Sequence, residues 1–330
     1  MNWSAYLRLL RLGNVFTAWA DVLAAILICT PALAQVPWAR ALLVLAASSC
    51  LYLGGMVLND VFDVEYDRQT RPDRPIPSGQ ISRKAAGILG AVLLAAGLGA
   101  AILSGPRVLA VAAWLAVAIV AYDAGTKWTI VGPILMGICR TLNFTLGLAL
   151  FEHAIWLPNQ LHVPLVGRLG TAAAVGLGLY VMSLTRFARY ETTGGGRIEL
   201  TTSLLGMNLG LLMAGFVAVA LRTRSLAALQ ATELPWADAY QDLLLSNDPN
   251  VLLIRGVWWI ALAAVVNASC LPAILSPQPR RIQATVRWLL IAIILYDAAV
   301  VSFVRGPTTG AIVAALILPT VVATRFLPAT

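Results

Sequence analysis

Residues 40–58, RALLVLAASSCLYLGGMVL, form a run of apolar and small residues with no charged residue after Arg40. A helix of about 20 such residues crosses the roughly 30 Å hydrocarbon core of a bilayer. Similar runs recur from one end of the 330-residue chain to the other, and charged residues make up only 12% of it. Soluble domains carry about 25% charged residues. The sequence therefore predicts an all-α, polytopic membrane helical bundle, with residues 1–330 as a single integral-membrane domain.

Ten apolar segments are candidate spans. They are residues 12–33, 40–58, 85–104, 107–122, 130–151, 170–187, 203–221, 251–270, 285–304 and 308–325. The last two are separated only by Arg305, Gly306 and Pro307, which predicts a tight turn. One of the ten could instead be a re-entrant or surface helix, so about nine to ten transmembrane helices are expected.

The formal charge of +8 does not indicate a nucleic-acid partner, because the basic residues lie at the ends of apolar runs. Residues in such places set membrane topology and contact anionic lipid. Arg8 and Arg11 belong to a short N-terminal amphipathic segment, which we place in the cytoplasm. With the later spans alternating, Arg and Lys are in excess on the inside. No eukaryotic targeting segment is present, so we expect a bacterial inner (cytoplasmic) membrane protein. Its inside loops, 59–84, 122–129 and 186–202, would then open together on the cytoplasmic face.

The four cysteines lie inside apolar segments without the spacing of metal ligands, and both histidines, His153 and His162, share one short loop. This pattern favours buried free thiols and argues against a zinc site.

An acidic segment, NDVFDVEYD at residues 59–67, directly follows the second candidate span. If the helix continues, Asp60, Asp63 and Asp67 fall on one face, and Asn59 lies one turn before Asp63. Three carboxylates repel each other there, and negative charge is unfavourable near a helix C-terminus. A divalent cation relieves both costs, and hard oxygen ligands suit Mg²⁺. The alternative is a solvated acidic helix end.

The next residues, Arg68 to Gly79, read RQTRPDRPIPSG. Arginines such as Arg74 can hold a diphosphate through paired hydrogen bonds. The prolines end the helix and stiffen the loop, and Ser82 is placed to cap the following helix.

Together, Asn59 to Asp67 and the tail through Gly79 resemble the first motif of the UbiA superfamily of intramembrane prenyltransferases. The order of spans, with inside loops after the second, fourth and sixth, is also similar to that family. The resemblance implies that Asn59, Asp60, Asp63 and Asp67 bind Mg²⁺ for a prenyl diphosphate. A tenth span would depart from the family's usual nine.

Other positions match the family in part. Asn14 resembles a polar residue beside the family's cavity, and the alternative is an asparagine that packs between helices. Tyr122 with Lys127 resembles the family's tyrosine followed by a basic residue, in which the cation contacts diphosphate, and the alternative for Lys127 is a charge that sets topology. Asp123 is unusual there, because it would repel phosphate. Arg140 and Asn143 lie within the fifth span, where an arginine is costly and usually faces a polar cavity or a partner. We expect both to line the pocket, and Asp297 is either the counter-charge of Arg140 or an unrelated buried group.

The family's second acidic motif is poorly matched. Residues 186–199 read RFARYETTGGGRIE, and only Glu191 stands where a metal-binding carboxylate is expected. Arg186 and Arg189 could bind phosphate directly, and Tyr190 is one of several aromatic residues that could stabilise a carbocation. The alternative for this segment is a flexible linker. The sequence is similar to a divergent branch of the superfamily, of the kind encoded in bacterial ebo-type gene clusters.

The resemblance implies a prenyltransferase that transfers an isoprenyl group from a prenyl diphosphate to a small aromatic or alcohol acceptor. Asp60, Asp63, Asp67, Lys127 and Glu191 would then be the catalytic residues. The alternative is a catalytically weak or inactive UbiA-like protein that binds or moves a lipid or aromatic precursor within a membrane complex. A transporter is a weaker option, since no inverted repeat is visible.

Overall fold

The computed structural model describes residues 3–125, 129–154, 165–229 and 249–326. All of the regular structure in these residues is helical. The helices are α1 (Trp3–Leu10), α2 (Val15–Ile28), α3 (Trp38–Phe62), α4 (Val64–Thr70), α5 (Arg83–Ser104), α6 (Pro106–Asp123), α7 (Val131–Leu148), α8 (Leu165–Ala188), α9 (Arg197–Leu229), α11 (Pro249–Leu275), α12 (Pro279–Arg305), α13 (Pro307–Ala314) and α14 (Ile317–Phe326). Short 3₁₀ turns are η1 (Leu12–Asn14), η2 (Leu33–Gln35) and η4 (Glu152–Ala154).

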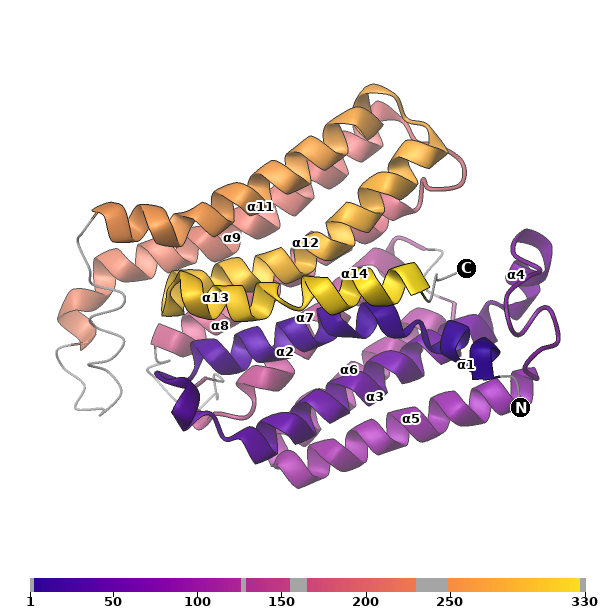
Figure 1. Ribbon diagram of the computed structural model, residues 1–330, viewed down its shortest axis with the longest axis horizontal. Coiled ribbons are helices and arrows are strands. Elements are labelled where there is room, and N and C mark those ends of the chain that lie inside the picture. The colour runs from indigo at the N-terminus through magenta and orange to yellow at the C-terminus, as the bar shows by residue number, and fades with distance from the viewer. Residues whose placement is uncertain (1–2, 126–128, 155–164, 230–248, 327–330) are drawn as a thin grey trace.

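Nine helical stretches among the described residues are long and apolar enough to cross a membrane. The expectation of a polytopic all-α bundle is therefore confirmed, with nine as the number of long spans. The tenth apolar run is divided between the shorter helices α13 and α14, which follow one another across the bundle (Figure 1). The protein is an integral membrane protein.

Two helices, α2 and α12, form the centre of the bundle. In the spans that contain them, Ser4–Ile28 and Pro279–Arg305, 67% of the most apolar stretch is buried inside the protein, against 22% for α5 on the periphery. α2 packs against α3, α7 and α12, and α13 and α14 lie along it as well (Figure 1). Helices in lipid gain little from burying apolar surface, so this arrangement depends on close packing and on polar contacts between helices.

Glycines permit the closest helix crossings. On α9, a Cβ at Gly210 would lie 2.5 Å from the carbonyl oxygen of Gly176 on α8. Gly306 has φ of 89° and precedes Pro307, so it forms the predicted tight turn between α12 and α13. The predicted cap is also present, since the Ser82 hydroxyl accepts a hydrogen bond from the Ala85 amide at 3.2 Å.

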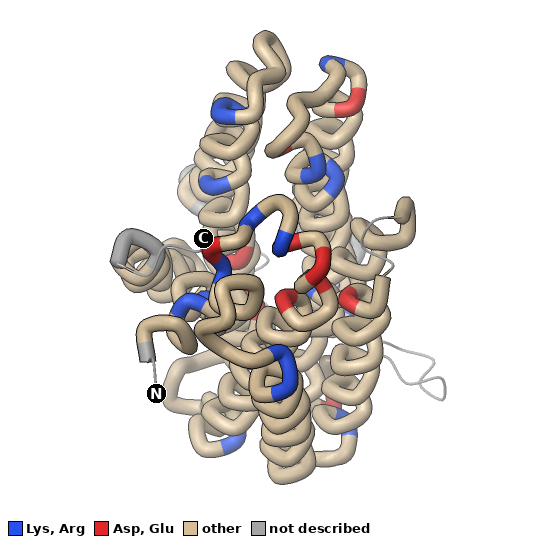
Figure 2. The backbone as a smooth tube through the Cα atoms, turned by 90° about the vertical axis from the view of Figure 1, so that its right-hand side faces the viewer, with Lys and Arg blue, Asp and Glu red and all other residues tan. Residues whose placement is uncertain are grey.

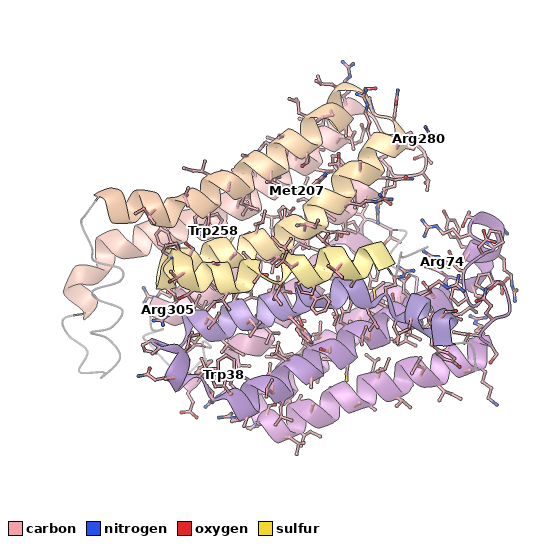
Figure 3. All side chains as sticks on the ribbon, viewed as in Figure 1. Trp38, Arg74, Met207, Trp258, Arg280 and Arg305 are labelled. Carbon is pink, nitrogen blue, oxygen red and sulfur yellow. The ribbon has the colours of Figure 1, made fainter. Side chains whose placement is uncertain are left out.

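One end of the bundle carries α1 and α4. The C-terminal ends of α3, α6 and α8 and the N-terminal end of α12 also lie there. Figure 3 places Arg74 and Arg280 at this end and Trp38 and Arg305 at the other. Viewed toward this end, acidic and basic residues gather around the middle of the face (Figure 2). Chemistry that needs charged groups is therefore concentrated here.

The crossing of α8 and α9 gives a testable prediction. We expect Gly210→Ala to destabilise the protein by roughly 1–3 kcal/mol, because the added methyl group overlaps backbone atoms of α8. Gly215→Ala is the matched control on the same helix, since nothing lies within 4 Å of a Cβ there. It should leave stability unchanged or slightly higher, because alanine favours the helix. Thermal unfolding in one detergent compares the two, and equal melting temperatures would contradict the tight crossing.

Candidate active site

The acidic segment lies at a bend in the chain. α3 ends at Phe62 and α4 starts at Val64, so Asp63 lies between the two helices. Helical hydrogen bonds continue through the bend: the Asp63 amide donates to the Asn59 carbonyl at 3.0 Å, and the Asp67 amide donates to the Asp63 carbonyl at 2.8 Å. Asp60 and Asp67 therefore keep one face, as their spacing predicts. Both are almost fully buried, at 2% and 1% exposure.

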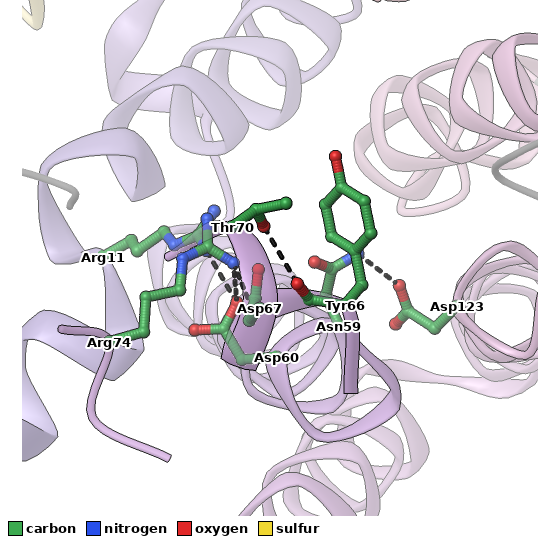
Figure 4. A network of polar contacts seen from close by, with 8 residues as sticks. All are labelled: Arg11, Asn59, Asp60, Tyr66, Asp67, Thr70, Arg74 and Asp123. Atoms are coloured by element: carbon green, nitrogen blue, oxygen red, sulfur yellow. Dashed lines mark hydrogen bonds and ion pairs between the residues drawn. The ribbon is translucent and has the colours of Figure 1, made fainter. Parts of the chain in front are cut away.

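One arginine joins these two carboxylates. The Arg74 Nη1 atom lies 3.2 Å from Asp60 Oδ1 and 2.6 Å from Asp67 Oδ2 (Figure 4). Arg74 is itself 5% exposed. Its loop is held because Ile76 and Ile81 pack in a small apolar core with α1. Arg74 was expected to hold a diphosphate, but in this structure its guanidinium is enclosed by the carboxylates.

A second arginine, which sequence reasoning treated only as a topology charge, also contacts Asp60. Arg11 Nη2 lies 2.6 Å from Asp60 Oδ1. Among the described residues, Arg11 alone combines a side chain with a positive φ, at 48°. This left-handed backbone is costly for a residue other than glycine and is often found at functional sites. The signal in the sequence was weak, since 49 residues separate the partners.

The second and fourth spans meet beside this cluster. The Asn59 amide donates to Asp123 Oδ1 at 2.9 Å (Figure 4). Asn59, Tyr122 and Asp123 line the rim of a cavity of about 100 Å³ that continues between α2, α3, α6 and α7. The rest of its wall is mainly apolar. The unusual Asp123 is thus a partner of Asn59.

The far end of the cavity is polar. Arg140 and Asn143 line it, as predicted. Arg140 Nη1 lies 2.7 Å from Asp21 Oδ2, and its other terminal nitrogen donates to Thr17. The Asn143 amide donates to Asp21 Oδ2 at 2.8 Å.

The acid that pairs with Arg140 is therefore Asp21 on α2, which sequence reasoning did not single out. Asp297 is fully buried beside this pair and interacts electrostatically with both members. It is a neighbour of the pair and forms no ion pair with Arg140 among the described residues. An acidic residue in the first apolar run was the available signal for Asp21.

The third loop reaches the same end of the bundle. Arg189 donates a hydrogen bond to the carbonyl of Thr129, which joins it to the loop after α6. Glu191 is half-buried, and burial raises the pKa of its carboxyl above the usual value, while Arg71 and Arg287 partly offset this. The three loops therefore converge, as expected. Glu191 thus interacts with one arginine of the first loop and with one of α12.

The remaining predicted residues are less closely joined to the site. Asn14 is half-buried at the start of α2 and interacts with Tyr52, which lines the cavity. Arg186 is exposed, and Tyr190 packs against Gly195. Lys127 lies outside the described residues.

The donor atoms present fit a divalent cation. Asp60 and Asp67 both contact one cationic group, the Arg74 guanidinium, and the same two carboxylates would be the ones to hold a metal ion. No group of three or more His, Cys, Asp or Glu side chains in the described part of the chain is close enough to bind a metal. Two carboxylates suit Mg²⁺ nonetheless, because it commonly uses one or two together with water and substrate phosphates.

Comparison with characterised proteins gives consistent matches. The digeranylgeranylglyceryl phosphate synthase of Methanoculleus marisnigri is 37% identical over 129 residues, which cover 39% of this chain and 45% of that protein. The synthase of the same name from Methanoregula boonei is 28% identical over 257 residues, covering 78% and 86%. The chain thus spans about half the length of the first relative and most of the second.

Solved structures share the fold. A UbiA homologue from Aeropyrum pernix K1 superimposes with a TM-score of 0.54 at 19% identity, covering 87% of this chain and 96% of that one. A UbiA homologue from Archaeoglobus fulgidus bound to GPP and Mg²⁺ gives 0.51 at 15% identity, covering 90% and 99%. The model of the UbiA prenyltransferase family matches residues 18–231, most of the chain. The protein therefore belongs to the UbiA prenyltransferase family.

Proposed function

We propose that this protein is a Mg²⁺-dependent prenyltransferase that transfers an isoprenyl group from a prenyl diphosphate to a small aromatic or alcohol acceptor. One observation carries the proposal: Asp60 and Asp67 converge on a single cationic position beside an apolar cavity. The relatives named as digeranylgeranylglyceryl phosphate synthases support a prenyltransferase. The homologue with GPP and Mg²⁺ supports the diphosphate and the metal.

The charged residues have separate roles in this proposal. Asp60 and Asp67 would hold Mg²⁺, with Asn59 and Asp63 adjacent and Glu191 contributing from the third loop. Mg²⁺ neutralises charge on a leaving diphosphate when it is bound. Arg11 and Arg74 pair with these carboxylates and would keep them ordered, and their guanidinium donors suit diphosphate oxygens. Arg186, Arg189 and Lys127 would add positive charge at the rim.

The reacting end of the prenyl group and the acceptor would meet in the cavity. A volume of about 100 Å³ accommodates only the reacting end of a prenyl group, so a longer tail would extend between helices toward lipid. In the reaction, the allylic C–O bond to diphosphate breaks and a bond from the acceptor to that carbon forms, while the acceptor loses a proton. The apolar wall limits capture of the reactive carbon by water. Arg140, Asn143, Tyr122 and Tyr190 are the proposed substrate contacts, with Asn14 beside them.

The proposed setting is the bacterial cytoplasmic membrane, with the converging loops in the cytoplasm. The excess of Arg and Lys in the inside segments supports this orientation. Membrane-complex partners remain part of the proposal.

A second candidate function is binding of a lipid or aromatic precursor without chemistry. It is favoured by the surroundings of Glu191, whose neighbours Arg71 and Arg287 can neutralise it without a metal. Such a binder would be indifferent to Mg²⁺, which separates the two candidates.

Binding of a prenyl diphosphate analogue at the proposed metal site should raise the thermal stability of the protein. A non-hydrolysable thio-analogue of a prenyl diphosphate should raise the melting temperature only when Mg²⁺ is present. At 100 times Kd, the stabilisation is about 2.7 kcal/mol. Asp67→Asn and Asp63→Asn should each abolish this shift. Glu65→Gln is the matched control on α4, since Glu65 is exposed and pairs only with Arg68 among the described residues. A shift of equal size without Mg²⁺ would favour the binding function.

The ion pair of Arg11 with Asp60 predicts that substitutions of Arg11 and Arg8 have different effects on stability. Arg11→Gln should destabilise the ligand-free protein by roughly 1–3 kcal/mol, because buried Asp60 loses a charged partner. Arg8→Gln is the control, since Arg8 makes an exposed hydrogen bond to Gln80. Its effect should stay within about 0.5 kcal/mol. Denaturant or thermal unfolding measures both, and an Arg11→Gln variant as stable as the wild type would exclude this role.

Variants at the polar end of the cavity should distinguish the effect of Arg140 on stability from its effect on turnover. Arg140→Gln should cost roughly 3–5 kcal/mol, because Asp21 is left in the bundle without its cation. The double variant Asp21→Asn/Arg140→Gln should recover most of that stability. If Arg140 also contacts the acceptor, the double variant will be folded and yet have a strongly reduced kcat/KM. Restored turnover would assign Arg140 to structure alone.

A further inference from the structure

A second hollow lies away from the candidate active site. It is an open groove of about 520 Å³ between α11 and α12, near the turn that joins them. Small side chains, including Ala268 and Ala284, leave the space between the two helices. Pro272 lies inside α11 and has no amide proton to donate to the carbonyl of Ala268. The groove therefore follows an irregular section of a lipid-facing helix.

The mouth of the groove is cationic. α12 begins with Pro279, Arg280 and Arg281, and its first turn contains no acidic residue. Positive charge is unfavourable at this end of a helix, because the macrodipole is positive there. Arg281 contributes to the lining, and its guanidinium donates to the Pro272 carbonyl at 3.3 Å. Among the described residues neither arginine forms an ion pair, so most of the donor capacity of Arg281 is available.

The interior of the groove is apolar and aromatic. Trp288 also lines it, and its side chain is 57% exposed. Trp288 is seven positions after Arg281, so both lie on one face of α12, about 10 Å apart along the helix. Thr285 closes the floor, donating to the Ser269 carbonyl at 2.8 Å. A cationic mouth above an apolar channel is complementary to an anionic head group with a hydrocarbon chain.

This face of α12 is distinct from the face that meets the candidate active site. Gln283 donates to the Glu191 carbonyl at 3.1 Å, and Arg287 interacts with the Glu191 carboxylate. The groove residues lie on the side toward α11. Figure 3 places Arg280 at the bundle end that also carries Arg74. The groove is thus at a level where the arginines in a membrane protein meet lipid head groups.

We propose that the groove binds one anionic phospholipid. Its phosphate contacts Arg281, with Arg280 adjacent, and one acyl chain lies past Ala284 along Trp288. The site is independent of the proposed prenyl transfer. A free phosphate shares the head-group chemistry but lacks the chain, and a zwitterionic lipid shares the chain but lacks the net charge. The experiment below separates these occupants.

The test is native mass spectrometry of the full-length protein in detergent with added phosphatidylglycerol, phosphatidylcholine or inorganic phosphate. We expect one retained phosphatidylglycerol, bound about tenfold more tightly than phosphatidylcholine and not displaced by millimolar phosphate. Arg281→Gln should weaken binding about tenfold through loss of a charge-assisted contact. Ala284→Trp should do the same by filling the groove while both arginines remain.

The matched control is Arg168→Gln, which removes one exposed arginine near the start of α8. It should bind phosphatidylglycerol as the wild type does. Melting temperatures in detergent without added lipid show whether each variant is folded. Equal retention of the two lipids, displacement by phosphate, or unchanged binding in both groove variants would each overturn the proposal.

Discussion

An ion pair in the interior of the bundle, between Arg140 of α7 and Asp21 of α2, is the interaction on which the rest of the site depends. In an apolar surrounding, neither charge is tolerated alone, so the two helices must stay in register. Asn143 extends the pair by donating to Asp21 and to the Ala18 carbonyl, and it accepts a hydrogen bond from Ser48 of α3 at 2.7 Å. These contacts fix α2, α3 and α7 around one cavity and hold the polar groups at its far end in place.

Buried charge is also stabilised at the loop end of the bundle, but with different partners. Asp60 and Asp67 lie close together at the end of a membrane helix, where their mutual repulsion and burial both cost free energy. Arg74 and Arg11 offset that cost by pairing with the carboxylates. The two arginines thereby keep the carboxylates aligned on one face.

Local sequence patterns predicted the local features well. Apolar runs indicated the spans, the spacing of Asp60 and Asp67 placed them on one face, and Ser82 caps its helix as expected. Hydropathy also left the tenth run ambiguous, and the structure divides it between α13 and α14.

Long-range partners could not be predicted. Arg140 and Asp21 are 119 residues apart, and Arg11 and Asp60 are 49 apart. No periodicity within one helix encodes such pairs. Arg74 shows the same limit: its type suggested an anion ligand, and only the folded loop shows that it is enclosed by two carboxylates. The relation of Glu191 to Arg71 and Arg287 likewise depends on how three loops meet.

The path of α13 and α14 has a consequence for the ends of the chain. α13 starts at the end of the bundle that carries Arg305, and α14 contacts η1, close to Arg11 (Figure 1). The last described helix thus returns to the side where the first one begins. Nine helices in the described part of the chain are long enough to cross alone, and α13 together with α14 adds one further passage along the bundle. A compartment-specific reporter enzyme fused after α14 would therefore face the same aqueous compartment as one fused before α1.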